Sequence, residues 1–352
     1  MQGFGLQIKP AGNNCNLRCK YCYAAPFAKS CIKIMPLDIL ETAIRKNLAF
    51  QGSVFFSWHG GEPLLAGIDF FKKAVEFIDK YKNSEHIVTN MVQTNATLIT
   101  PEFAQFFKDN DITVSVSIDG PEFLHNLNRV DHAGIGSFSN VMRGVKYLRD
   151  VGLQPPVIAT ITQDSIKYGK EIFDFLVTSG FTDIKFSPVY DSCSDNFSVS
   201  SDDWFYFLKD VLHAWFEHGD TSVKVREIDE VVAWLSNKTM NLCASKHSCL
   251  SWISIDPDGN IYPCEYLRSE MPYGNILDMD LADVYKTASY ARFKKLFLHK
   301  PEKCQKCRFW DLCGNGCPAT RVKDGLMTHD GVYVYCEERI KLFNELKNIL
   351  ES

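Results

Sequence analysis

Three cysteines stand close together near the start of the chain, at Cys15, Cys19 and Cys22. Their spacing, C-x3-C-x2-C, offers three thiolates, which can ligate three irons of a four-iron cube and leave the fourth iron open. An open coordination position is what a reactive metal centre needs. A three-cysteine zinc site, or three cysteines without a ligand role, are the alternatives. The spacing, the aromatic residue that follows and the place directly after a predicted strand favour the iron–sulfur interpretation.

A second group of eight cysteines falls in the last third of the chain, at Cys243, Cys249, Cys264, Cys304, Cys307, Cys313, Cys317 and Cys336. Eight thiolates suffice for two four-cysteine sites. Two structural zinc ions are one interpretation, because C-x2-C and C-x3-C pairs also suit zinc ribbons. Beside an iron–sulfur site, two auxiliary iron–sulfur clusters are the favoured interpretation. Cys31 and Cys193 are left over, and we interpret them as non-ligands.

Composition narrows the class of protein. The chain has 352 residues, 45% of them hydrophobic, and carries a formal net charge of −5. The slight acidity argues against a broad basic face for nucleic acid, and no run approaches the roughly 20 apolar residues that span a bilayer. The start, MQGFGLQIKP, lacks the features of a signal peptide, and an odd count of 13 cysteines fits poorly with disulfide pairing. We therefore expect a cytoplasmic protein that binds neither nucleic acid nor membrane.

Strand-like and helix-like segments alternate before residue 220. The pattern predicts strands at 5–10, 54–59, 86–93, 112–118, 156–162 and 183–189, and helices at 37–49, 68–82, 101–109, 136–151, 166–179 and 202–217. Such alternation implies right-handed βαβ units and a parallel sheet. Six repeats suit an α/β fold, a partial (β/α)6 TIM-like barrel. In such barrels chemistry gathers at the C-terminal ends of the strands, and the first cysteines directly follow the first strand.

The sequence pattern changes from about residue 240. Regular periodicity fades, and ISIDPDGNIYPC predicts a β-hairpin around the turn at 256–259. We expect a small cysteine-stapled domain with little apolar core, followed by one closing helix. The expected organisation is a barrel at 1–225, a cysteine-rich domain with two auxiliary clusters at 226–336 and a C-terminal helix at 337–352.

The first motif, with Tyr21 before its third cysteine, resembles the signature of the radical S-adenosylmethionine (SAM) superfamily. The resemblance implies that Cys15, Cys19 and Cys22 hold a [4Fe-4S] cluster whose open iron chelates SAM. One electron then cleaves SAM, and the 5′-deoxyadenosyl radical takes a hydrogen atom from the substrate. The same resemblance makes Gly60-Gly61-Glu62-Pro63 the segment that receives the SAM amino group. It also places Ser117 near SAM and Arg143 at the SAM carboxylate, with Arg129 as a rival.

The late cysteines resemble the SPASM domain of radical SAM peptide-modifying enzymes, which holds two auxiliary [4Fe-4S] clusters. Its pattern, C-x9-15-G-x4-C and then C-x2-C-x5-C-x3-C with a final cysteine, fits from Cys249 to Cys336. The resemblance implies three [4Fe-4S] clusters in all. It assigns the nearer auxiliary cluster to Cys243, Cys249, Cys264 and Cys317, and the outer one to Cys304, Cys307, Cys313 and Cys336.

Over its whole length the chain most resembles the anaerobic sulfatase-maturating enzymes, which oxidise one Cys or Ser of a sulfatase to formylglycine. The matching segments include IKPAGNNCNLRCKYCY, QTNATLI, SIDGPEFLHNLNR and IYPCEY. Three positions depart from that pattern. Glu265 replaces an Asp that acts as general base, and its extra methylene moves the carboxylate. His59 replaces a Gln before GGEP, and Ala24 replaces a Tyr. Glu265 without proton transfer, and His59 as a structural hydrogen-bonding group, are the plain alternatives.

The segment WHGGEP resembles SPASM enzymes that modify ribosomally made peptides. We therefore predict a radical SAM peptide maturase that takes a hydrogen from a side-chain β-carbon and forms a C–C crosslink of the cyclophane type. Glu265 and His59 are its expected catalytic residues. Its expected partners are a peptide or protein substrate and a flavodoxin- or ferredoxin-type reductant. The alternatives are a sulfatase maturase, a thioether-forming maturase and a zinc-stabilised binding protein without enzyme activity.

Overall fold

The computed structural model describes residues 4–28, 30–190, 195–238, 242, 248–267, 271–323, 326–327 and 331–351. Two of the cysteines discussed above, Cys193 and Cys243, lie outside these ranges. Within the described ranges, every helix is too short or too polar to cross a membrane.

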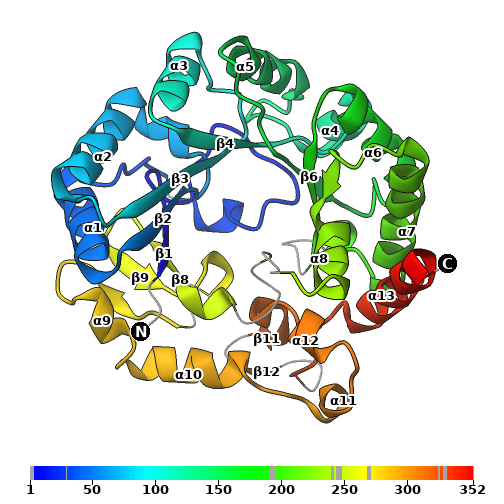
Figure 1. Cartoon of the computed structure of the whole chain (residues 1–352). Coiled ribbons are helices and arrows are strands. Elements are labelled where there is room, and N and C mark those ends of the chain that lie inside the picture. The colour runs from blue at the N-terminus through cyan, green and yellow to red at the C-terminus, as the bar shows by residue number, and fades with distance from the viewer. Residues whose placement is uncertain are drawn as a thin grey trace.

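A parallel sheet forms the inner layer of the molecule (Figure 1). The six predicted strands are confirmed as β1 (Gly5–Ile8), β2 (Ser53–Trp58), β3 (Ile87–Thr94), β4 (Ile112–Ser117), β5 (Val157–Ile161) and β6 (Asp183–Pro188). Each pairs in parallel with the next, and a two-residue strand, β7 (Lys224–Val225), follows β6. The expected α/β class with a partial TIM-like barrel is confirmed, and β7 is too short to show in the sequence pattern.

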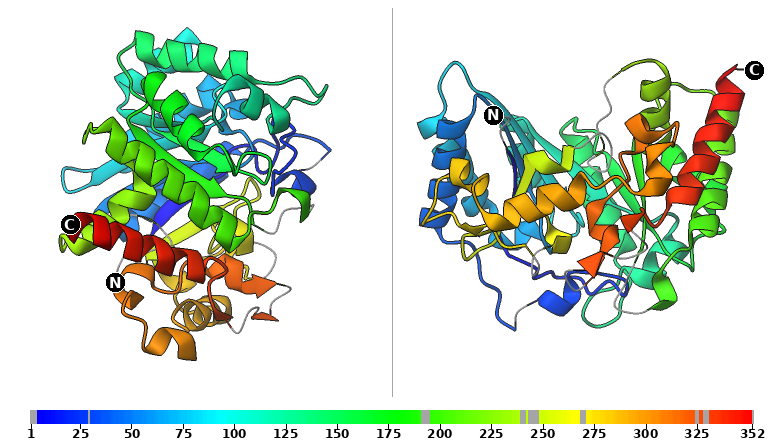
Figure 2. Two further views of the ribbon diagram at one scale, coloured as in Figure 1. Left: turned by 90° about the vertical axis from the view of Figure 1, so that its right-hand side faces the viewer. Right: turned by 90° about the horizontal axis from the view of Figure 1, so that it is seen from below.

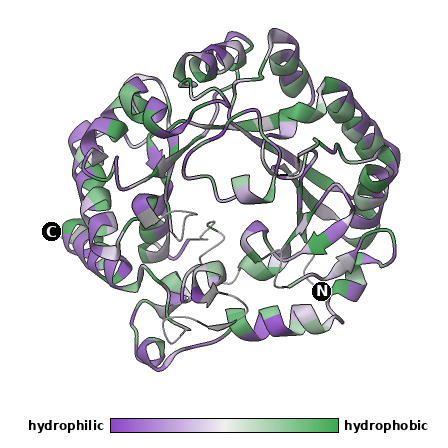
Figure 3. Cartoon of the chain, turned by 180° about the vertical axis from the view of Figure 1, so that it is seen from behind, coloured by the Kyte–Doolittle hydropathy of each residue, from purple (hydrophilic) through white to green (hydrophobic). Residues whose placement is uncertain are grey.

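Helices cover the outside of this sheet (Figure 1). The six predicted helices are α1 (Leu37–Phe50), α2 (Ile68–Tyr81), α3 (Pro101–Asp109), α5 (Phe138–Asp150), α6 (Gly169–Thr178) and α7 (Ser201–His218). Each shows apolar positions toward the sheet and polar positions toward solvent, and the two kinds alternate along the ribbons in Figure 3. Two of the described helices around the parallel strands, α4 (Glu122–Asn128) and α8 (Arg226–Leu235), were not predicted. Both are short, so their periodicity is weak.

The predicted hairpin consists of β8 (Trp252–Ile255) and β9 (Asn260–Tyr262), which pair antiparallel. β8 also pairs in parallel with β1, so the hairpin extends the barrel sheet, and β10 (Gly274–Asn275) follows β9. The strand order is therefore β10-β9-β8-β1-β2-β3-β4-β5-β6-β7. The expectation of a separate small domain missed this continuity, because sheet pairing between distant segments leaves no mark in local sequence.

The remaining C-terminal elements are short and close the ring between β1 and α8 (Figure 1). They are α9 (Leu281–Val284), α10 (Ala288–Phe297), α11 (Glu302–Gln305), α12 (Trp310–Cys313), β11 (Val322–Lys323) and β12 (Leu326–Met327), with 3-10 turns η4 (Ser248–Ser251), η5 (Glu265–Leu267) and η6 (Pro318–Arg321). The predicted closing helix, α13 (Cys336–Glu351), lies along α7 (Figure 2). Apolar side chains of this region, such as Phe293 and Phe309, belong to the same core as the barrel, so the expectation of little apolar core is wrong.

Three further 3-10 turns belong to the barrel half: η1 (Ala25–Phe27), η2 (Pro63–Ala66) and η3 (Asp195–Phe197). η1 ends the loop that carries the first three cysteines, and η2 begins at the proline of the GGEP segment. Both therefore stand at the C-terminal ends of β1 and β2, where the sequence predicted the chemistry.

Candidate active site

The loop after β1 carries Cys15, Cys19 and Cys22, whose side chains are partly buried. The backbone N–H of Leu17 donates to Cys15 Sγ over 3.3 Å, and Asn95 Nδ2 donates to it over 3.5 Å. Burial raises the pKa of the Cys15 thiol to about 12 and that of Cys19 to about 11, and the neighbouring thiols add to both shifts. Thiols that affect one another in this way lie close together. Their thiolate forms need a positive partner, which cluster irons supply.

A strap at residues 128–132 braces this cluster loop from outside. The N–H of Arg18 donates to Val130 O over 2.7 Å, and the N–H of Lys20 donates to Asn128 O over 3.0 Å. His132 Nε2 lies 3.1 Å from Cys15 O. Backbone hydrogen bonds on both sides of Cys19 therefore hold the loop in place independently of metal binding.

The GGEP segment packs directly on the cluster loop. The N–H of Gly61 donates to Gly12 O and that of Glu62 to Asn14 O, each over 2.9 Å. A Cβ on Gly61 would stand 2.1 Å from Asn14 O, and one on Gly60 2.4 Å from Gly12 O. Both glycines are thus required by backbone-to-backbone packing. The sequence had suggested close approach to a ligand as their reason.

The carboxylate of Glu62 is completely buried. It accepts from Leu64 N over 3.0 Å, from Thr94 Oγ1 over 2.7 Å and from Asn95 N over 2.8 Å. Burial raises the pKa of Glu62 to about 7, although the three donors oppose the shift. Its side chain therefore ties the GGEP segment to the end of β3. Reception of the SAM amino group by this segment, Pro63 included, stays a prediction.

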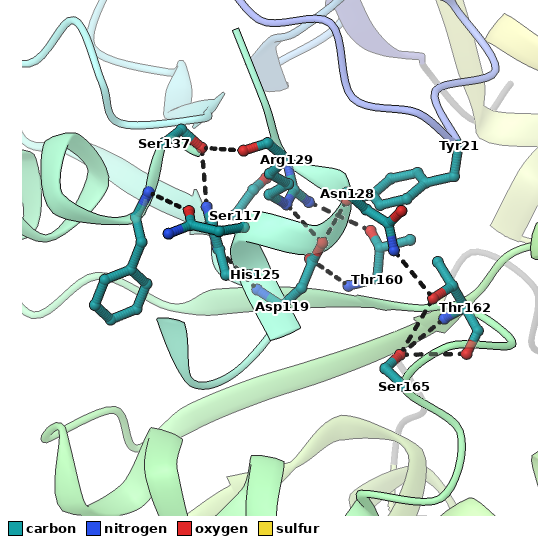
Figure 4. A network of polar contacts seen from close by, with 12 residues as sticks. Tyr21, Ser117, Asp119, His125, Asn128, Arg129, Ser137, Thr160, Thr162 and Ser165 are labelled. Atoms are coloured by element: carbon teal, nitrogen blue, oxygen red, sulfur yellow. Dashed lines mark hydrogen bonds and ion pairs between the residues drawn. The ribbon is translucent and has the colours of Figure 1, made fainter. Parts of the chain in front are cut away.

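Asp119 organises the ends of β4 and β5 (Figure 4). It accepts from Tyr21 Oη over 2.5 Å and from Thr160 N over 2.9 Å, and Arg129 Nε lies 2.9 Å away. The Arg129 guanidinium also stands over the Tyr21 ring at 5.6 Å. Burial would lower the pKa of Arg129, but Asp119 and other neighbours raise it, so the cation is stable. The aromatic residue before the third cysteine is thus locked to the strand ends.

The two arginines considered for the SAM carboxylate differ in location. Arg143 is exposed on α5, where its Nη1 donates to Asn140 Oδ1 over 2.8 Å. Arg129 is only 8% exposed and lies among the strand-end groups. The burial of Arg129 among the strand-end groups favours it over Arg143, and the assignment of either arginine to the SAM carboxylate stays a prediction. Ser117 accepts from Gln93 Nε2 over 3.0 Å at the end of β4, and its place beside SAM stays a prediction.

Lys9, at the end of β1, connects the barrel to the C-terminal hairpin. Its ammonium nitrogen lies 2.7 Å and 2.8 Å from the two carboxylate oxygens of Glu265, and 3.4 Å from Asp256 Oδ1. It also donates to Asn13. Lys9 and Asp256 are 1% exposed, and the Glu265 side chain is 5% exposed. One buried cation therefore faces two buried carboxylates, one of them the expected base.

His59 directly follows β2 and is partly buried. Its Nδ1 accepts from Gly60 N over 2.7 Å, so in the neutral ring the hydrogen is on Nε2. Burial lowers the pKa of His59 to about 4, and the positive charges of Lys9 and Lys185 lower it further. At neutral pH His59 is therefore an uncharged hydrogen-bond donor through Nε2, whose place in catalysis stays a prediction.

Three tyrosines lie between the first cysteines and the late ones. The ring centroid of Tyr266 is 4.4 Å from that of Tyr23 and 5.4 Å from that of Tyr190. Burial raises the pKa of Tyr266, and the charges of Cys264, Cys317 and then Cys22 add to this rise. Tyr266 is still 44% exposed, so this neutral phenol faces open space between the two cysteine groups. Ala24, where the maturase pattern has a tyrosine, is buried beside them.

The late cysteines fall into two neighbourhoods. Burial raises the pKa of Tyr273 and of Tyr266. The charges of Cys249 and Cys264 add to the rise at Tyr273, and those of Cys264 and Cys317 add to the rise at Tyr266. The pKa of Cys304 is raised by burial and then by Cys313 and Cys307, and the pKa of Cys336 is raised by Cys313 and Cys304 as well. These groupings agree with the ligand sets that the resemblance implies, except that Cys243 lies outside the described residues. Cys31 is exposed.

Within the described ranges, no three His, Cys, Asp or Glu side chains converge as a single metal ion requires. A four-iron cube needs no such convergence, because each thiolate binds a different iron.

Sequence reasoning missed Lys9, Asp256 and Tyr266 as members of the site. A lysine at the end of a buried strand, in LQIKP, was the available signal for Lys9. Asp256 looked like an ordinary turn residue, and only the pairing of β8 with β1 brings it beside Lys9. Tyr266 stands next to Glu265 in IYPCEY, where nothing marked it as exposed.

Two family models match the chain. The model of the radical SAM superfamily matches residues 10–167, and that of an iron–sulfur cluster-binding domain, SPASM, matches residues 247–308. They confirm the expected cofactors, SAM with its iron–sulfur cluster in the barrel and auxiliary clusters in the C-terminal region. The interpretation as a zinc-stabilised binding protein without enzyme activity is therefore wrong.

Relatives match over nearly the whole length. A cysteine-type anaerobic sulfatase-maturating enzyme of Clostridium perfringens is 30% identical over 334 residues, which cover 91% of this chain and 90% of the relative. A serine-type enzyme of Bacteroides thetaiotaomicron is 27% identical, with coverages of 97% and 89%. The structure of native anSMEcpe with bound AdoMet superposes with a TM-score of 0.89 at 28% identity, covering 99% of this chain and 100% of that one.

A protein whose structure is known with a bound precursor peptide also shares the fold. Streptococcus suis SuiB bound to precursor peptide SuiA superposes with a TM-score of 0.70, covering 95% of this chain and 75% of that one. At 17% identity this likeness shows the fold alone. The relative that matches at 30% identity over 91% of this chain and 90% of its own length decides the family. The chain therefore belongs to the radical SAM superfamily and, within it, to the family of the anaerobic sulfatase-maturating enzymes.

Proposed function

We propose that this enzyme oxidises the β-carbon of a Cys or Ser side chain in a sulfatase to the aldehyde of formylglycine. The carrying observation is the match to cysteine-type and serine-type maturases over about nine tenths of each chain. The structure of native anSMEcpe with bound AdoMet and Cp18Cys peptide adds support, because it superposes with a TM-score of 0.87. Among the comparisons, only a likeness of fold supports the crosslinking function that the sequence favoured, so we now place it second.

The proposal gives each cysteine group one task. Cys15, Cys19 and Cys22 hold the SAM cluster, and the two late sets hold the auxiliary clusters. When bound, the SAM cluster supplies the electron that releases a 5′-deoxyadenosyl radical, which takes a hydrogen atom from the substrate β-carbon. Asp119 and Arg129 keep Tyr21 and the cluster loop in place, and the guanidinium of Arg129 is our candidate partner for the SAM carboxylate.

The substrate radical must then lose one electron to an auxiliary cluster and one proton to the protein. Glu265 is our proton acceptor, although Lys9 holds both of its oxygens. Asp256 makes this workable, because Lys9 remains paired with Asp256 when Glu265 takes up the proton. The triad thus passes from one excess negative charge to neutrality without leaving a buried charge alone.

His59 and Tyr266 are our candidates for substrate contact. The Nε2–H of neutral His59 donates a hydrogen bond to a peptide carbonyl, and the exposed ring of Tyr266 supplies an apolar face for an extended peptide. The substrate then lies between the barrel and the C-terminal region, beside Glu265.

Mass analysis of the treated peptide tests the proposal. The reconstituted enzyme is incubated with SAM, reductant and a sulfatase peptide that contains the target Cys, and a Ser version is run in parallel. We expect loss of two hydrogens from both peptides, accompanied in the Cys peptide by exchange of sulfur for oxygen as water hydrolyses the thioaldehyde and sulfide leaves. Both aldehyde products should be trapped by a hydrazide. Consumption of SAM without a trappable aldehyde from either peptide contradicts the proposal.

C–C crosslinking of a small precursor peptide is the second candidate. The replacements Glu265, His59 and Ala24 favour it, because they change the groups expected around the target side chain. The same assay separates the two functions. A crosslinked product has lost two hydrogens, retains its sulfur and does not react with hydrazide.

The electron donor is also part of the proposal. Arg18 and Lys20 flank Cys19, are exposed, and make no ion pair among the described residues. On a chain of net charge −5 they attract an acidic carrier such as flavodoxin to this loop. Replacing both by Glu should lower flavodoxin-driven SAM cleavage ~10-fold while dithionite-driven cleavage is unchanged, and Lys73→Glu on α2 is the control. Equal loss with both reductants contradicts this docking site.

A further inference from the structure

Arg321 is a buried cation at the end of η6, four residues after Cys317. Its side chain is 0% exposed, although arginine is among the residues least often buried completely. Nη1 donates to Leu296 O over 3.2 Å. Within the described part of the chain, Nε and Nη2 are buried without a hydrogen-bond partner, and Arg321 is in no ion pair with a carboxylate. Such a guanidinium is costly unless an acceptor of negative charge stands beside it.

The ionisable groups that act on the pKa of Arg321 are cysteine side chains. Burial lowers its pKa, and Cys317, Cys249, Cys304 and Cys313 raise it again. Two of these cysteines belong to the nearer proposed ligand set and two to the outer one. Arg321 therefore interacts electrostatically with cysteines of both sets, and its buried Nε and Nη2 have no protein hydrogen-bond partner among the described residues.

We propose that Arg321 is a shared counter-ion of the two auxiliary clusters and raises the reduction potential of both. The inference rests on the ligand sets proposed above. A four-thiolate cluster is negatively charged and gains another negative charge on reduction, so a nearby buried cation stabilises the reduced form. The unpartnered N–H groups are the donors to cluster sulfur that such tuning needs. Through this effect Arg321 favours transfer of an electron from the substrate radical to the oxidised auxiliary cluster.

Arg339 on α13 provides a matched comparison. Its Nη1 lies 3.5 Å from Cys313 Sγ and 3.4 Å from Cys313 O, and its guanidinium stands 4.5 Å from the centroid of the Tyr333 ring. Cys313 is in the outer set, and it is the only cysteine among the groups that act on the pKa of Arg339 within the described residues. Arg339 should therefore influence the outer cluster only.

The test is a potentiometric titration of the anaerobically reconstituted holoenzyme, followed by electron paramagnetic resonance. Arg321→Met should move both auxiliary potentials to more negative values and leave the SAM-cluster potential unchanged. Arg339→Met should move only the outer auxiliary potential. Arg321→Lys, which keeps the charge, should restore most of the lost potential. Auxiliary potentials unchanged in Arg321→Met at full iron content would overturn the proposal and leave Arg321 a structural residue.

Folding and function are controlled separately. If Arg321→Met fails to bind a full complement of iron, Arg321→Lys and Arg321→Gln provide the comparison, and equal potentials in these two variants contradict the role of charge. The titration needs no peptide substrate. A wrong choice between formylglycine formation and crosslinking therefore leaves its result intact, and a wrong ligand set is detected by iron analysis of the cysteine variants.

Discussion

The two cysteine regions are built in different ways. The first three cysteines come from one loop, and that loop is held by strand-end groups, a backbone strap and the GGEP segment. The seven described late cysteines are spread from Cys249 to Cys336 over short turns, two four-residue helices and the first residue of α13. The barrel thus positions the first site by hydrogen bonds, whereas the late thiols are positioned by segments with little structure of their own.

We expect iron ligation to contribute differently to the stability of the two regions. Helices of four residues are unstable without tertiary support, so we expect ligation to add to the support that the shared apolar core gives the C-terminal region, as metals do in small domains. The first site has no such need, because its loop is anchored to a ten-stranded sheet. Loss of the SAM cluster should therefore remove activity with little change in stability, and loss of an auxiliary cluster should loosen structure.

The largest effect is expected from the triple variant Cys15→Ala, Cys19→Ala and Cys22→Ala. SAM cleavage should fall below detection, and iron should drop from about twelve to about eight per chain. The thermal midpoint should change little, because Tyr21 and Asp119 still hold the loop. Chromatography of 5′-deoxyadenosine, iron analysis and a melting curve measure these outcomes. Persistent cleavage would show that the site is misassigned.

The double variant Cys304→Ala and Cys313→Ala tests the other region. It should lose the outer cluster and open the C-terminal segment to protease, with cleavage sites between residues 298 and 336. Reductive SAM cleavage without peptide should persist, because the barrel is intact. Limited proteolysis and 5′-deoxyadenosine analysis provide the measurements, and Cys31→Ala, at an exposed cysteine, is the control. A protease pattern identical to that of the parent enzyme contradicts the structural role.

The sequence predicted the barrel well because its evidence is local. Strand and helix periods, and the place of cysteines directly after β1, required no knowledge of distant contacts. The same holds for the turn at 256–259. What local sequence lacks is the pairing of β8 with β1, which places Asp256 and Glu265 beside Lys9. Only the assembled sheet reveals that the expected base is held by a buried lysine.

The arginines show the same limit within the barrel. From the sequence alone, Arg143 and Arg129 are equally plausible partners for the SAM carboxylate, since both follow β4. Helix α4 was not predicted, and its end is what directs Arg129 toward Asp119. A seven-residue helix carries too little periodicity to be found, so the choice between the two arginines had no local basis.

Asp119→Asn sharpens the comparison on the barrel side. It leaves Arg129 buried without a charged partner and weakens the bond from Tyr21, so the free energy of unfolding should fall by about 3–5 kcal/mol. SAM affinity should fall as well, because the cluster loop loses its anchor. Denaturant unfolding and equilibrium SAM binding measure both effects. Asp174→Asn, at a half-exposed carboxylate on α6, is the control and should change stability by less than about 1 kcal/mol.

The smallest expected effect is a pH dependence of the free energy of unfolding that comes from Glu227, where α8 meets the barrel. Its carboxylate accepts from Phe186 N over 3.2 Å. Burial raises the pKa of Glu227 to about 7, although Lys185 and hydrogen bonding oppose this.

Because the folded-state pKa lies above the ordinary carboxyl value, the folded protein binds the proton more tightly. The stabilisation is complete below that ordinary value and is lost as the pH rises through about 7. Between pH values of about 5 and 8 the free energy of unfolding should fall by at most roughly 3 kcal/mol from this group. Glu227→Gln should flatten that fall, whereas Glu76→Gln on the surface of α2 should preserve it. If the pH dependence of stability is unchanged in Glu227→Gln, other titratable groups cause the loss of stability and Glu227 does not contribute to it.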